Sequence, residues 1–99
     1  MEVRRVFDAG RPTHGKRVVV FVAPGSDGLA VVAARRVGGA VERNRARRIL
    51  RAAWRAVAPQ VVHGNDVVLV AREAIRGAKT QDLVVEMTEL LPAAGLVRP

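Results

Sequence analysis

Residues 35–55 read RRVGGAVERNRARRILRAAWR, and the fold depends on this stretch. After Gly38-Gly39 the pattern predicts a long amphipathic helix over Val41–Val57. The helix stops before Pro59, because proline disfavours helix in the residue that precedes it. At about 100° per residue, apolar side chains cover one arc of this helix and basic side chains the opposite arc. The apolar arc is expected to pack on a sheet, and it consists of Ala46, Ile49, Leu50, Ala53, Trp54 and Val57.

The segments on both sides of the long helix predict strands. Arg17–Ala23 is rich in valine and reads as a strand, and so does Leu29–Val37. Pro, Gly, Ser and Asp at positions 24–28 favour a tight turn, so these two strands are predicted to form a hairpin. A second turn at 63–66 leads into a buried strand over Val67–Arg72.

Two further helices complete the prediction. Val3–Asp8 is a short helix closed by Gly10, and Thr80 is the expected N-cap of a last helix that ends at Pro92. The resulting order is αβ(β)βαβα, in which the bracketed strand is optional. We expect a single domain over residues 1–99. We expect an α+β fold, a two-layer α/β sandwich in which helices pack on a mixed sheet.

Charge is distributed unevenly along the chain. It has 17 Lys and Arg against 9 Asp and Glu, a formal net charge of +8. Residues 1–59 hold 13 basic and 4 acidic groups, whereas residues 60–99 hold 4 and 5. Such asymmetry favours one polyanion-binding face. The chain has no cysteine, no apolar run long enough for a bilayer and no signal-like N-terminus, so we expect a cytoplasmic protein without a membrane partner.

The basic arc of the long helix favours nucleic acid over a merely solvated surface. Solvated helix faces usually mix charges of both signs, but no acid follows Glu42 in this helix. Like charges four residues apart repel by a few tenths of a kcal/mol per pair. The row Arg43, Arg47, Arg51 and Arg55 therefore opposes folding unless an anion compensates it. Arginine also binds phosphate through two parallel hydrogen bonds.

The same stretch resembles the signature of the protein subunit of bacterial ribonuclease P, which runs basic-basic-apolar-Gly-x-Ala-x-x-Arg-Asn-x-x-basic-Arg-x-x-Arg. It falls here on Arg35, Arg36, Val37, Gly38, Ala40, Arg43, Asn44, Arg47, Arg48 and Arg51. The resemblance covers nearly the whole chain. It implies that the RNA subunit of ribonuclease P is bound through Arg35, Arg36, Arg43, Asn44, Arg45, Arg47, Arg48 and Arg51.

The resemblance implies further properties. The protein would assist the removal of the 5′ leader from precursor tRNA, and it would contact that leader in a cleft between the first helix and the sheet. Phe7, Phe21 and Arg17 stand at the matching positions. The chain itself would bind no cofactor, since the Mg²⁺ ions that perform cleavage are held by the RNA. The family fold also implies a left-handed βαβ crossover, and we expect the free protein to be a monomer.

Some positions depart from the family pattern. Val3 stands where the family usually has a second aromatic residue, and Ala34 replaces a frequent serine. The basic segments that the family often carries beyond its core are also absent from this sequence. These departures predict either weaker leader binding than is typical or compensation by the RNA partner.

Other functions remain open at this point. The main alternative is a structural RNA-binding protein of ribosomal type, which would have no role in cleavage. A DNA-binding module lacks a helix-turn-helix partner here, and neither His14 nor His63 has neighbours at metal-ligand spacing. The positions of Phe7 and Phe21 would distinguish the ribonuclease P role from the ribosomal-type role. Rings on one open face near Arg48 and Arg51 would favour leader binding, whereas buried rings would leave the basic motif as the only support.

Overall fold

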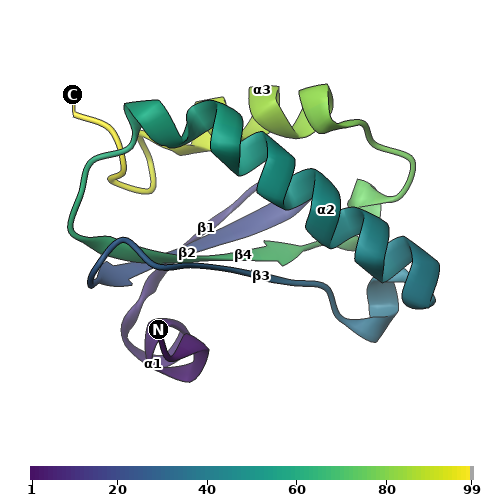
Figure 1. Ribbon diagram of the computed structural model, residues 1–99, viewed down its shortest axis with the longest axis horizontal. Helices are drawn as coiled ribbons and strands as arrows, with labels where there is room; N and C mark the ends of the chain where they lie inside the picture. The colour runs from purple at the N-terminus through teal and green to yellow at the C-terminus, as the bar shows by residue number, and fades with distance from the viewer. Residues whose placement is uncertain (99) are drawn as a thin grey trace.

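The chain forms a four-stranded sheet with helices on both faces, as the computed structural model shows for residues 1–98 (Figure 1). Helix α2 and helix α3 lie side by side on one face, and the short helix α1 lies on the other. The elements are α1 (Val3–Ala9), β1 (Arg11–His14), β2 (Val18–Pro24), β3 (Leu29–Val32), the 3₁₀ turn η1 (Arg35–Val37), α2 (Ala40–Val57), η2 (Ala58–Gln60), β4 (Asn65–Ala71), η3 (Glu73–Ile75) and α3 (Thr80–Leu90).

The strand order is β1-β2-β4-β3, with antiparallel pairing except between the parallel strands β3 and β4. This mixed sheet confirms the predicted α+β class. The extra strand allowed for in the predicted order is β1, at the edge of the sheet, where Pro12 is tolerated. Helix α2 connects the parallel pair, and the left-handed sense of that crossover stays a prediction from the family.

The predicted hairpin between β2 and β3 is wrong, because β4 lies between these two strands. β4 is apolar from Val67 to Ala71 and buried along most of its length, which suits a central strand rather than an edge. The turn at 25–28 instead wraps around the beginning of β4. Gly25 N–H donates to the carbonyl of Gly64 at 2.9 Å, and Val67 N–H donates to that of Gly28 at 2.9 Å.

Alternation along the central strands gives the sheet two apolar faces. Val18 and Val20 of β2 pack towards α2 and α3, whereas Phe21 and Ala23 face α1. The larger core lies under α2 and α3. It contains the buried face of α2, namely Ala46, Ile49, Leu50, Ala53 and Val57, with Trp54 half-buried against it. The apolar arc predicted from the sequence is therefore the docking face of the helix.

The structure places two element boundaries differently from the sequence prediction. The second predicted strand ends at Val32 instead of Val37, because residues 35–37 form a 3₁₀ turn before α2. Thr80 is the first residue of α3 and not its N-cap, which is Lys79. The backbone N–H of Lys79 donates to the carboxylate of Asp82 at 2.9 Å. An acid three residues into the helix thus satisfies the terminus that a threonine was expected to satisfy.

Candidate nucleic-acid interface

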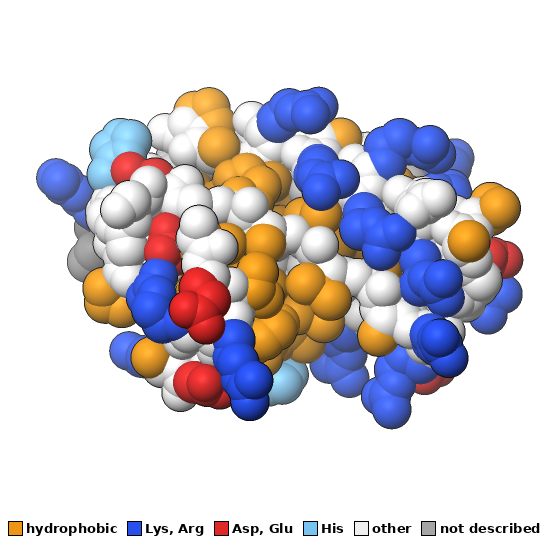
Figure 2. Space-filling view, turned by 60° about the horizontal axis from the view of Figure 1, so that its bottom comes forward, with side chains coloured by type: hydrophobic (Ala, Val, Ile, Leu, Met, Phe, Trp, Pro, Cys, Tyr) orange, Lys and Arg blue, Asp and Glu red, His pale blue; other side chains and the backbone are white. Residues whose placement is uncertain are grey.

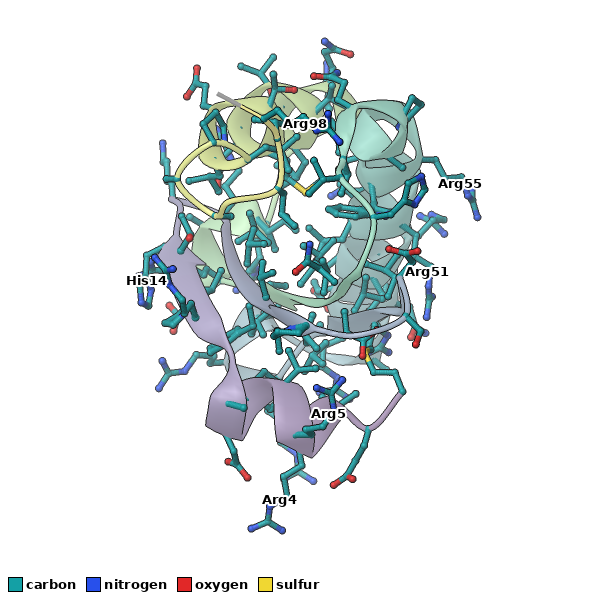
Figure 3. The ribbon with its side chains drawn as sticks, turned by 90° about the vertical axis from the view of Figure 1, so that its left-hand side faces the viewer. Arg4, Arg5, His14, Arg51, Arg55 and Arg98 are labelled. Carbon is teal, nitrogen blue, oxygen red and sulfur yellow. The ribbon has the colours of Figure 1, made fainter. Side chains whose placement is uncertain are left out.

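The arc of α2 opposite its buried face carries the arginines predicted from the sequence. Arg48, Arg51 and Arg55 are exposed, and Arg51 and Arg55 point outward from the helix (Figure 3). Arg47 donates to the side-chain oxygen of Asn44 at 2.6 Å, so these two motif residues hold each other in place. The helix thus presents guanidinium groups on a rigid element, which suits the recognition of phosphates at fixed spacing.

No acidic side chain among residues 1–98 forms an ion pair with the arginines of this arc. Glu42, the only acid of the helix, lies in its first turn, where it complements the helix dipole. A row of unneutralised arginines is available to a polyanion, and binding one would relieve the repulsion between neighbours.

Two motif arginines make hydrogen bonds to the backbone instead of pointing freely into solvent. Arg43 donates to the carbonyl of Gly38 at 3.1 Å. Arg45 lies off the basic arc and donates to the carbonyl of Ala78 at 2.8 Å, which attaches the loop before α3 to α2. The predicted binding role of Arg45 is therefore combined with a structural one.

The glycine pair before α2 shapes the entry to the basic helix. Gly38 has φ = 146°, and a Cβ there would approach the Cβ of Glu42 to 2.8 Å. A residue with a side chain would be strained by its backbone conformation and by this contact. The glycine in the motif is thus explained by the geometry that joins η1 to α2.

Arg35 and Arg36 lie in η1, just before α2. Both are exposed, and Arg36 faces Glu73 at 3.9 Å across well-exposed side chains. Such an exposed pair contributes little to stability, about 0–1 kcal/mol. Arg36 also lines the sheet face that carries α1. The structure therefore separates Arg36 from the outward arc of α2, although the two are adjacent in sequence.

Phe7 and Phe21 meet on the sheet face that carries α1. Their ring centroids lie 4.9 Å apart with an interplanar angle of 80°, an edge-to-face contact. Phe7 is 38% exposed, and Phe21 is half-buried. The rings are open to solvent as leader binding requires, but they do not share a face with Arg48 and Arg51, because α2 packs on the other side of the sheet.

An open groove of about 640 Å³ continues across this sheet face. Val19 and Val70 form its floor, and Val19 lies two residues before Phe21 on the same side of β2. His14, Arg36 and Arg72 line its walls. Figure 2 shows hydrophobic side chains across the middle of the molecule, with Lys and Arg most densely gathered to the right of them and others at the left among Asp and Glu. The sequence prediction missed His14 and Arg72, whose place depends on how β1 and β4 lie in the sheet.

Arg17 makes its contacts away from the aromatic pair, and its predicted place in the leader cleft stays a prediction. Its guanidinium donates to Glu86 of α3 at 3.1 Å, and its backbone N–H donates to the same carboxylate at 2.8 Å. Helix α3 packs on the opposite face of the sheet. A buried carboxylate partner directs Arg17 to that side.

Residues 1–98 contain no group of three or more His, Cys, Asp or Glu side chains placed to hold a metal ion. In the same part of the chain, no helix is both long enough and apolar enough to cross a membrane. The polar chemistry of the described surface is dominated by arginine.

Comparison with known proteins agrees with the basic motif. The model of the family described as Ribonuclease P matches residues 1–95. A ribonuclease P protein component of Chloroflexus aurantiacus is 40% identical over 101 residues, which span 97% of this chain and 74% of that protein. The component of Symbiobacterium thermophilum is 35% identical over 97 residues, spanning 94% of this chain and 84% of that protein.

Solved structures show the same fold. The ribonuclease P protein of Staphylococcus aureus superimposes with a TM-score of 0.81 at 18% identity, covering 96% of this chain and 90% of that one. The Thermotoga maritima protein gives a TM-score of 0.79 at 23% identity and covers 94% of each chain. With a family match over residues 1–95 and relatives this similar over nearly its whole length, the chain belongs to the bacterial ribonuclease P protein family.

Proposed function

We propose that this chain is the RNA-binding subunit of a bacterial ribonuclease P, and that it helps a catalytic RNA to remove the 5′ leader of precursor tRNA. The observation that carries the proposal is the unneutralised arginine arc of α2, which lies within the family's motif. Arg43, Asn44, Arg47, Arg48 and Arg51 would bind the phosphates of the RNA subunit. An alternative ribosomal-type role is not favoured, because the family match extends over almost the entire chain.

Cleavage itself is assigned to the RNA subunit, whose bound Mg²⁺ ions would supply the chemistry. The described residues form no carboxylate or histidine cluster of metal-binding size, so we assign no metal ligand to this chain. Its contribution would be to bind and orient two polyanions. We expect it to act as a monomer before assembly, in the cytoplasm.

The leader is proposed to lie along the groove beside α1. Phe7 and Phe21 offer ring surface to an unpaired base, and stacking of this kind contributes about 1–3 kcal/mol per base with little regard to sequence. Arg36 and Arg72 at the groove wall would meet its phosphates. Such contacts suit leaders of variable sequence, since neither stacking nor phosphate binding reads base identity.

The experiment that tests the function is precursor-tRNA cleavage by a bacterial ribonuclease P RNA at low Mg²⁺, with and without this protein. Acceleration that grows with the length of the 5′ leader is the expected result. Acceleration without leader dependence would retain the subunit role and contradict the leader contact. Tight RNA binding without any acceleration would overturn the proposal in favour of a structural RNA-binding role.

A further inference from the structure

Helix α1 depends on tertiary contacts for its position. It has only seven residues and no side-chain hydrogen bond at its N-terminus, and helices this short are not stable alone in water. Val6 is its one fully buried side chain, packed with Ala23 and Val68 of the sheet. Val3 is half-buried against the same cluster, so a short apolar row holds the helix against the sheet, and contacts to either side of that row restrict its rotation about the helix axis.

Arg5 supplies a second anchor beside Val6. Its guanidinium donates to the carbonyl of Pro24 at 3.0 Å and forms an ion pair with Asp66 at the beginning of β4. Figure 3 shows Arg5 directed back towards the sheet, whereas Arg4 points away from the molecule. The two neighbouring arginines of α1 thus have different surroundings.

Asp66 joins three segments of the chain. It is 4% exposed, and its carboxylate also accepts the N–H groups of Ser26 at 3.1 Å and Gly28 at 2.8 Å. These bonds and the charge of Arg5 hold the pKa of Asp66 below its ordinary value. Gly25 lies so close to the carboxylate that a Cβ there would overlap it. The ion pair therefore ties α1 to a fixed point of the sheet.

Arg5 and Phe7 flank Val6 on the helix. At about 100° per residue, they project to either side of the buried valine. With Arg5 fixed on one side, rotation of α1 about its apolar row is restricted further, and the ring of Phe7 stays against Phe21 on the other side. Loss of the ion pair would free this rotation without removing any aromatic residue.

We propose that Arg5 and Asp66 are positioning residues of the leader-binding face, because their ion pair sets the rotation of α1 and so holds Phe7 edge-on to Phe21. The role in leader binding rests on the function proposed above. The role in ring placement does not, so the two can be tested separately.

The first test measures the rings directly. Phe7 and Phe21 are the only phenylalanines, and the chain has no tyrosine, so their aromatic NMR signals are readily assigned. Arg5→Met is expected to weaken the nuclear Overhauser effect between the rings. Arg4→Met removes the same charge from the same helix and is expected to preserve it, and Arg5→Lys should restore much of it. An unchanged ring contact in Arg5→Met would overturn the proposal.

The second test uses the holoenzyme reconstituted with a bacterial ribonuclease P RNA. For a substrate with a long leader, Arg5→Met is expected to raise KM by about five- to tenfold, on the scale of one weakened stacking contact, with little change in kcat. For a substrate with a one-nucleotide leader, KM should not change. Arg4→Met should match the wild type on both substrates.

The two tests separate the possible failures. If the wild-type protein shows no leader dependence, the proposed leader contact fails, while the NMR result still decides ring placement. If the wild type depends on the leader and Arg5→Met behaves like Arg4→Met, the positioning role is wrong. An equal rise in KM for both substrates would also contradict it, since that result indicates an effect that does not depend on the leader.

Discussion

Glu86 accepts two hydrogen bonds from Arg17, one from the backbone N–H at 2.8 Å and one from the guanidinium at 3.1 Å. The side chains are 10% and 25% exposed, respectively. The carboxylate therefore pins the beginning of β2 to helix α3 across the larger core. An arginine that the family resemblance assigns to a binding cleft acts here in the packing of a helix on the sheet.

Removal of this carboxylate should destabilise the fold. Glu86→Ala leaves a backbone N–H and a guanidinium without their partner, so we expect the free energy of unfolding to fall by about 1–3 kcal/mol. Urea titration followed by the fluorescence of Trp54 measures the change. Glu89→Ala on the exposed side of α3 is the control and should stay within about 0.5 kcal/mol of the wild type. Equal stability of the two variants would contradict the role of Glu86.

The affinity for ribonuclease P RNA should fall steeply with salt. Each phosphate that α2 neutralises releases counterions, so log K is expected to decrease linearly with log salt, with a slope of about −0.7 to −0.9 per contact. Filter binding of the RNA at several potassium chloride concentrations measures the slope. A flat dependence would show that the arginine arc does not dominate binding.

Arg48 offers a sharper test of the same arc. It is exposed, and its side chain makes no hydrogen bond or ion pair within residues 1–98. Arg48→Ala is expected to weaken RNA binding by about 1–3 kcal/mol, as for a lost charge-assisted hydrogen bond. Thermal stability should stay equal or rise slightly, because a like charge is removed from the helix.

The matched control for Arg48 is Arg98→Ala, which removes one exposed arginine outside α2. It should leave RNA binding nearly unchanged. A similar loss of affinity in both variants would mean that net charge, rather than the arc of α2, governs binding. A large loss of stability in Arg48→Ala would reveal a structural role for that residue.

Local periodicity is enough to predict α2 and its two faces. Ile49 and Leu50 are buried and Arg48 and Arg51 are exposed, as a repeat of 3.6 residues requires. Helix contacts between neighbours in sequence are local, so the pattern of residues carries them directly. The candidate RNA-binding arc therefore follows from the order of the residues in α2 alone.

Strand pairing is not predictable in the same way. The turn at 25–28 is compatible with a hairpin between β2 and β3. The strand that pairs with both of them instead, β4, lies some 40 residues further along the chain. Asp66 stabilises the observed pairing by accepting the N–H groups of Ser26 and Gly28, and Glu86 holds Arg17 beside α3 in the same way. Both acids lie far in sequence from the groups they bind, so no local pattern reveals them.

The carboxylate of Asp66 predicts how stability responds to acid. Its pKa is lowered from 3.8 in the folded chain, first by the N–H of Gly28, and with further contributions from Ser26 and Arg5. Because the folded pKa is the lower one, the unfolded chain binds more protons at Asp66 than the folded chain does at pH values between the two. The contribution of Asp66 is thus fully present above about pH 5 and is lost as the pH falls through the folded pKa.

We therefore expect the difference in unfolding free energy between the wild type and Asp66→Asn to be largest above about pH 5 and to shrink as the pH falls through the lowered pKa of Asp66. Urea titrations across this range, followed by Trp54 fluorescence, measure it. Asp8→Asn changes an exposed carboxylate of the same helix that Asp66 anchors and is the control. A difference for Asp66→Asn that is constant with pH would mean that its charge does not hold α1 and the turn at 25–28 together.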